Sequence, residues 1–146
     1  MAQTARLYKI LHVREQEKDQ AQMNRMHAVE QFEHVATQLY EQLKEKEAAE
    51  QKLSRLMSGQ ITMEKMKEQS LYIQNLSNQL VSLQHRVQDA RKTMENKQEL
   101  LNEAHIEMKK IEKMIEIRET QKKQAAKRLD ATMMDEISMR QFYNIQ

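Results

Sequence analysis

The chain carries almost none of the residues that interrupt helices or make turns. It has one glycine and no proline in 146 residues, whereas a globular chain of this length holds roughly 17 of the two together. Sandwiches, barrels and folds that alternate strands with helices need far more turns than this, so they are excluded. Charged residues make up 32% and aromatic residues 4% of the chain, which is typical of long helices and coiled coils.

The one glycine marks the predicted turn. Gly59 follows a periodic segment, and glycine commonly ends a helix because it tolerates a positive φ. Thr62 is placed to cap the helix that follows, since its hydroxyl can accept a backbone N–H. We therefore expect a single domain over residues 1–146: a first helix over about 4–57, a turn at Ser58–Thr62, a second helix over about 63–132, and a C-terminal tail over 133–146.

Apolar stripes at spacings of three and four indicate how these helices pair. The stripe of the second helix runs from Ile73 to Ile115 and is interrupted only by Lys97, a pattern that winds as a left-handed coiled coil. The stripe of the first helix, from Leu7 to Leu56, is weaker and needs a partner helix. A short turn makes that partner antiparallel, with residue i opposite about 120 − i. The predicted fold is all-α, an antiparallel coiled-coil hairpin whose second helix is longer and overhangs the first.

Composition narrows the classes of function. The absence of cysteine excludes disulfides and thiolate metal sites, and there is no apolar run long enough for a transmembrane helix. The segment Met1–Arg14 lacks the features of a secretory signal, so a cytosolic protein is expected. A formal net charge of +2 is too even for a dedicated nucleic-acid binder.

No catalytic constellation is visible, and no catalytic residue, metal or cofactor is predicted. One glycine cannot build a phosphate-binding loop, and the zinc-protease pattern HExxH is absent. His27, Glu30 and His34 share a helix face and could hold a metal, but the Glu-x-x-His pairing of di-iron bundles is missing. Solvated histidines are the favoured interpretation.

Three features remain as candidates for binding a partner protein. The basic segment Arg118–Arg128, near the end of the second helix, is either a solvated helix face or a patch that meets an acidic partner. The tail that follows is more apolar than solvent exposure requires, and it either folds onto its own seam or docks into a partner. Tyr72, beside the stripe, either widens the seam or anchors a partner.

The whole chain resembles the FliJ family of flagellar export proteins, in the form found in Gram-positive rods. The residues that carry the resemblance are the opening Leu7-Tyr8-Lys9-Ile10-Leu11, the segments Phe32–Ala36 and Leu39–Glu41, the Ser58-Gly59 turn, Tyr72–Leu76, and the tail Met134–Phe142. The tail is the most specific of these.

The resemblance implies a soluble, non-enzymatic component of the flagellar protein export apparatus, located in the cytoplasm at the cytoplasmic face of the basal body. Such proteins form a stalk that inserts the end bearing the chain termini into the ring of the export ATPase FliI. They also contact the export gate protein FlhA and handle export chaperones. The implied chain binds no nucleic acid and reaches the membrane only through its partners. A generic homodimeric coiled-coil scaffold is the alternative.

The resemblance also assigns residues to these contacts. In the family, an aromatic residue followed by leucine four positions later contacts the gate, and Tyr72 and Leu76 match that spacing. The next two family contacts correspond to Gln79 and Leu83, which depart from the pattern, so the assignment stops there. The residues expected to face the ATPase are Arg118, Lys122, Lys123, Lys127, Met134, Asp135, Glu136 and Phe142.

Overall fold

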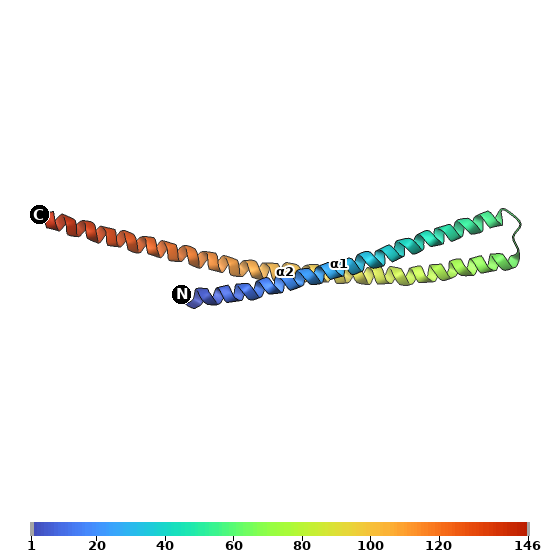
Figure 1. The fold of residues 1–146 in the computed structure, drawn as a ribbon, viewed down its shortest axis with the longest axis horizontal. Helices are drawn as coiled ribbons and strands as arrows, with labels where there is room; N and C mark the ends of the chain where they lie inside the picture. Colours follow the sequence, from blue (N-terminus) through green and yellow to red (C-terminus); the bar gives the residue numbers. More distant parts are fainter. Residues whose placement is uncertain (1, 146) are drawn as a thin grey trace. The chain divides into compact units, whose positions relative to one another are not determined.

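The computed structural model describes residues 2–145, which form two helices joined by a short turn. Helix α1 spans Ala2–Met57, helix α2 spans Met63–Ile145, and residues 58–62 connect them (Figure 1). Both helices are free of glycine and proline, so the ladder of i to i−4 hydrogen bonds continues without interruption. The predicted all-α class and the position of the turn are confirmed.

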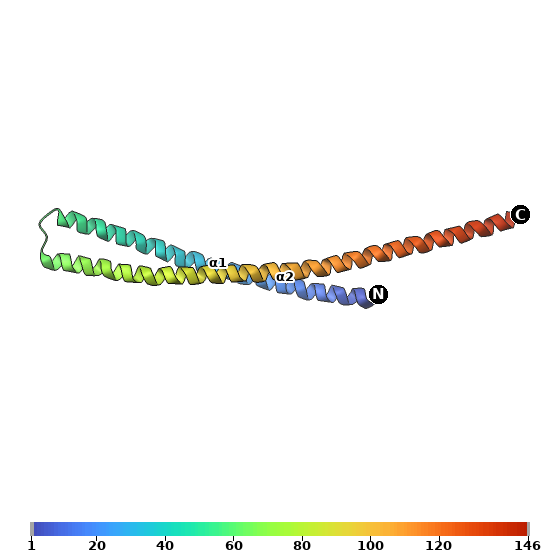
Figure 2. The same cartoon turned by 180° about the vertical axis from the view of Figure 1, so that it is seen from behind.

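The contacts within the chain divide it into two parts, each built from both helices. The hairpin part comprises residues 20–101, and the terminal part comprises residues 2–19 and 102–145. In the hairpin part, the segments of α1 and α2 lie side by side and are joined by the turn, as the view from behind shows (Figure 2). Because the turn is short, the two segments run antiparallel.

The core of each part consists of seam residues. All the buried apolar side chains that the structure describes belong to the two predicted stripes, and no described side chain is less than 2% exposed. This core is thin, because each helix has only one neighbour to cover it. The hairpin part buries Ala28, Val35 and Ala49 of α1 with Leu76, Leu80 and Leu83 of α2. The terminal part buries Leu7 of α1 with Met108 and Ile115 of α2.

Hydrogen bonds across the seam report which residues face each other. In the terminal part, Arg118 Nη1 donates to Gln3 Oε1 at 2.9 Å. In the hairpin part, the Tyr72 hydroxyl donates to Glu45 Oε1 at 2.8 Å. Both pairs agree with the predicted register to within one turn of helix.

The end of α1 differs from the prediction. Gly59 does not adopt a positive φ, so the conformational freedom of glycine is not what ends the helix. Instead, the Ser58 hydroxyl donates to the Arg55 carbonyl oxygen at 2.8 Å, and the Gly59 N–H donates to the Leu56 carbonyl oxygen at 3.2 Å. These two bonds satisfy carbonyl groups that the end of a helix leaves without partners.

The start of α2 is capped as predicted. The Lys65 backbone N–H donates to Thr62 Oγ1 at 3.4 Å, and the Met66 N–H donates to the Thr62 carbonyl oxygen at 3.1 Å. The carboxylate of Glu64 in the first turn adds a favourable interaction with the helix dipole.

Gly59→Ala is expected to preserve stability or to raise the free energy of unfolding by up to about 1 kcal/mol, because alanine lowers the conformational entropy of the unfolded chain. A Cβ atom at Gly59 would meet only the Leu56 carbonyl oxygen, at an ordinary contact distance of 3.8 Å. Urea denaturation followed by circular dichroism measures the difference. A loss above about 1 kcal/mol would contradict the observed turn and favour a glycine-specific conformation.

Helix α2 continues well past the start of α1 in the terminal part. Arg118 faces Gln3, and every described side chain of residues 120–144 is exposed. The sequence pattern sets residues 133–146 apart as a tail, whereas the structure continues α2 through Ile145, and Gln146 lies outside the described residues. The helix persists because the segment holds no breaker and is rich in residues of moderate to high helix propensity. The predicted overhang is confirmed and is longer than expected.

Candidate partner-binding surfaces

Tyr72 and Leu76, the predicted gate contacts, differ sharply in accessibility. The side chain of Tyr72 is 43% exposed, whereas Leu76 is 5% exposed and packs in the seam. A seam side chain is unavailable to a partner while the hairpin is closed. The structure therefore does not bring the two residues together as one exposed surface; it leaves Tyr72 accessible and uses Leu76 to hold the hairpin.

Tyr72 is fixed against α1 by its hydroxyl group. The hydrogen bond to Glu45 Oε1 places the ring over a shallow groove between the helices. This bond, together with partial burial and the negative charge of Glu45, raises the pKa of the Tyr72 phenol above its ordinary value. The groove is lined further by Ala48, Ala49, Lys52 and Gln69.

The raised pKa predicts a difference between the natural chain and Tyr72→Phe in alkaline solution. The folded state favours the neutral phenol over the phenolate more strongly than the unfolded state does. The contribution of Tyr72 to stability is therefore fully present below a pH of about 10. It is lost as the pH rises through the folded-state pKa. Urea denaturation between pH 8 and 11 is expected to show the natural chain losing stability relative to Tyr72→Phe. Parallel curves would contradict the hydrogen bond.

The basic segment lies on the overhang. Lys122, Lys123 and Lys127 are exposed, and none of them forms an ion pair with a described carboxylate. Arg118 is half-buried and is engaged with Gln3 of α1. The structure thus separates the predicted basic residues into one arginine that joins the two helices and three lysines that face solvent.

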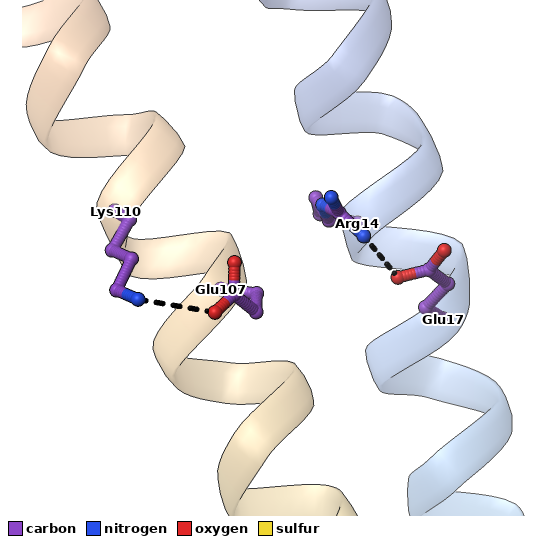
Figure 3. Close-up of polar contacts among 4 residues, drawn as sticks. All are labelled: Arg14, Glu17, Glu107 and Lys110. Atoms are coloured by element: carbon purple, nitrogen blue, oxygen red, sulfur yellow. Dashed lines mark hydrogen bonds and ion pairs between the residues drawn. The ribbon is translucent and has the colours of Figure 1, made fainter.

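Several charged residues elsewhere in the terminal part have a partner of opposite charge on their own helix. Lys110 Nζ lies 3.1 Å from Glu107 Oε1, and Arg14 Nη1 lies 3.0 Å from Glu17 Oε2. Figure 3 shows that each of these pairs stays on one helix. Such pairs, three residues apart, offset charge locally. The three lysines of the overhang lack this compensation and form an open patch of positive charge.

The end of the overhang presents apolar and acidic side chains to solvent. Met134 and Phe142 are 65% and 63% exposed, and Asp135 and Glu136 between them are also exposed. The segment does not fold back onto the seam, which was one of the two interpretations left open by the sequence. Further exposed apolar residues, which the sequence assignment omitted, are Met133, Ile137, Met139 and Tyr143.

A second groove in the hairpin part was not predicted. It lies between the helices, next to the Tyr72 groove, and shares Glu45 with it. Glutamine at a seam position, as at Gln42, is a signal that the sequence offers for an imperfectly filled seam. The lining residues are Gln38, Glu41, Gln42, Glu45, Gln79, Ser82, Leu83 and Arg86.

The histidines considered as metal ligands do not converge. His27 Nδ1 lies 4.0 Å from Glu30 Oε2, while His34 Nε2 lies 3.4 Å from the side-chain nitrogen of Gln38. Within residues 2–145, no group of three histidine, aspartate or glutamate side chains comes together in a way that could hold a metal ion. Nor does either helix, over the same residues, contain a stretch that is apolar enough to cross a membrane.

Comparison with known proteins places the chain beside flagellar proteins. The family model described as "Flagellar FliJ protein" matches residues 3–146. A curated protein with that same description, from Bacillus subtilis (strain 168), is 37% identical over 145 residues, and the alignment covers 97% of both chains. No solved structure matches the chain. Both matches extend through the turn and the overhang, so they cover every candidate surface described above.

Proposed function

The chain belongs to the FliJ family and is a component of flagellar protein export, and we propose that it acts as a non-enzymatic stalk. In this proposal, the overhang inserts into the ring of the export ATPase. The same proposal places the turn-proximal end toward the export gate protein and the molecule at the cytoplasmic face of the basal body. It also includes export chaperones as partners.

The observation that carries the proposal is the uncovered end of α2. Residues 120–144 are helical and exposed throughout, with no segment of α1 opposite them. A single helix of this kind gains most of its stability from packing against something else. Exposed methionine and aromatic side chains supply apolar contact area, and the three lysines supply attraction for an acidic surface. An exposed helix with apolar contact area and a positive patch is suited to insertion into a partner protein.

The gate contact in this proposal rests on Tyr72. Its ring is accessible and its orientation is restrained by Glu45, so a partner that binds it does not have to order a mobile side chain. Leu76 contributes indirectly, because it keeps α1 and α2 together at the same level of the hairpin.

A non-enzymatic role agrees with the kind of surface the described residues provide. The hollows between the helices are shallow and open to solvent, whereas active sites usually enclose the substrate and exclude water. We propose that the chain changes the rate of ATP hydrolysis by its partner and hydrolyses nothing itself.

Binding to the export ATPase of the same organism tests the proposal. The purified chain is expected to co-purify with that ATPase and to raise its rate of ATP hydrolysis. Met134→Asp combined with Phe142→Asp is expected to weaken both effects, because the charges oppose burial of the two side chains.

Met23→Asp combined with Met26→Asp is the matched control. These methionines are similarly exposed but lie in the hairpin part, so this variant is expected to bind and stimulate normally. Full stimulation by the variant of the overhang, or an equal loss in both variants, would refute insertion of the overhang.

A further inference from the structure

We infer that the groove bounded by Gln38–Glu45 of α1 and Gln79–Arg86 of α2, called here the glutamine groove, receives a lysine or arginine side chain from a helix of a partner protein. The groove contains Gln79 and Leu83, which occupy the positions of the family's next two gate contacts, so the inference deepens the proposed gate contact and rests on it. The titration that tests it uses no gate protein and no ATPase, so its failure is distinguishable from failure of the proposed function.

Two side chains that line the glutamine groove carry hydrogen-bond acceptors without donors. The side-chain oxygens of Gln38 and Gln42 are buried and have no hydrogen-bond partner. The amide nitrogen of Gln38 is turned toward His34 Nε2 at 3.4 Å, which directs its oxygen away from that ring. A buried acceptor without a donor destabilises a fold, so these two atoms indicate that the groove is incomplete.

The position of Gln42 in the seam favours an apolar residue if stability alone is considered. Gln42 lies on the apolar stripe of α1, where its side chain is half-buried, and Leu83 of the opposite helix is among the buried residues that line the same groove. Leucine at position 42 would bury apolar surface and remove the unsatisfied oxygen. A glutamine at this position is explained if a donor from outside the chain completes it.

The charges around the glutamine groove identify the donor as a cation. Glu41 and Glu45 are exposed on the α1 side of the groove, and Glu45 is already oriented by the Tyr72 hydroxyl. Arg86 is the only positively charged residue in the lining, and no ion pair joins it to either carboxylate. A lysine ammonium offers three donors and an arginine guanidinium five, so either can pair with the exposed carboxylates. Rotation of the two glutamine side chains would then bring their buried oxygens to the remaining donors.

The shape of the site indicates that this cation comes from a helix. The glutamine groove has a volume of about 470 Å³ and opens along the two antiparallel helices. Similar hollows flank it at Tyr72 and at the paired alanines Ala28 and Ala90. A third helix laid along such a line can place one basic side chain in the central hollow and smaller contacts in the other two.

A titration of the full-length chain with two model peptides tests the inference. The first is a helical peptide of about 15 alanine and glutamine residues with one central arginine; the second carries citrulline, which keeps the shape of arginine and loses its charge. With the chain labelled with ¹⁵N, the arginine peptide is expected to shift the side-chain amide signals of Gln38 and Gln42. It should bind about tenfold more tightly than the citrulline peptide, because charge-assisted hydrogen bonds are stronger than neutral ones.

Three variants separate recognition of the cation from an effect on the fold. Glu41→Gln is expected to weaken binding of the arginine peptide severalfold, whereas Glu33→Gln, at an exposed site outside the groove, leaves it unchanged. Gln42→Leu is expected to raise the urea midpoint of unfolding and to abolish the shift at Gln38.

Four results would overturn the inference. Equal binding of the two peptides, or no binding by either, would show that the chain does not recognise the cation. An equal loss of arginine-peptide binding in Glu41→Gln and Glu33→Gln would show that the groove is not the binding site. A dimer in sedimentation that Gln42→Leu dissociates assigns the groove to a second copy of the chain instead.

Discussion

Leu80→Ala is expected to lower the free energy of unfolding by about 2 to 3 kcal/mol, the lower part of the range for buried leucines. Leu80 is 4% exposed and lies in the seam of the hairpin part. Truncation removes the apolar surface that the leucine buries and leaves a cavity between the helices. Because only two helices surround the site, they can close part of that cavity, which limits the loss. Urea denaturation followed by circular dichroism at 222 nm measures it.

Val81→Ala supplies the control for this prediction. Val81 is the next residue along α2 but is 53% exposed, so its truncation is expected to change the free energy of unfolding by no more than about 0.5 kcal/mol. Equal effects of the two substitutions would mean that the observed seam is not the one that stabilises the chain in solution.

A substitution at Leu76 changes the stability of the hairpin as well as any contact with a partner. Leu76 is buried as deeply as Leu80, so Leu76→Ala is expected to loosen the hairpin whether or not the gate protein binds there. Tyr72→Ala, at an exposed side chain, tests the proposed gate contact more cleanly. Loss of gate binding in Tyr72→Ala, with an unchanged circular dichroism spectrum, would support the proposal.

Reversal of the three exposed lysines of the overhang is expected to have the largest effect on partner binding. Glutamate at positions 122, 123 and 127 replaces an open positive patch with a negative one, and attraction to an acidic surface becomes repulsion. Electrostatic steering of this kind alters association rates by about 10- to 1000-fold at low salt. We therefore expect the association rate with the export ATPase to fall by at least about tenfold, and the difference to shrink as salt screens the charges.

A variant with glutamate at Lys65, Lys67 and Lys92 controls for net charge. It makes the same change in total charge, but at exposed lysines of the hairpin part. It is expected to bind the ATPase at nearly the natural rate. If both variants associate equally slowly, only total charge matters and the overhang has no special role. If neither is affected, the proposed contact of the lysines is wrong.

The seam could be predicted because a single rule determines it. In a two-helix coiled coil, burial follows the spacing of three and four, and the described residues that are buried, such as Leu7, Leu80 and Ile115, all obey that spacing. The position of the turn was predictable from the chain's single glycine and from Thr62, which supplies a cap. The expected reason was only half right, because Gly59 adopts no positive φ.

The surfaces were harder to predict because they depend on the row beside the seam. Tyr72 and Leu76 are one helical turn apart, yet one is accessible and the other is buried, since α1 covers only one of the two rows they occupy. The glutamine groove has the same origin. Whether the oxygens of Gln38 and Gln42 meet a donor depends on the side chains that α2 presents to them, and the spacing of residues along α1 does not contain that information.

The hydrogen bond between Gln3 and Arg118 joins two residues that the ribosome synthesises far apart in time. Its partners are separated by 115 positions, and translation adds about 5 to 20 residues per second. The first turns of α1 must therefore wait roughly 6 to 23 seconds before the part of α2 that covers them has been synthesised. Pairing of the helices can begin at the turn and proceed toward the chain termini, so the residues synthesised first are the last to be buried. Throughout that interval, Leu7 and its neighbours are open to any chaperone that binds nascent chains.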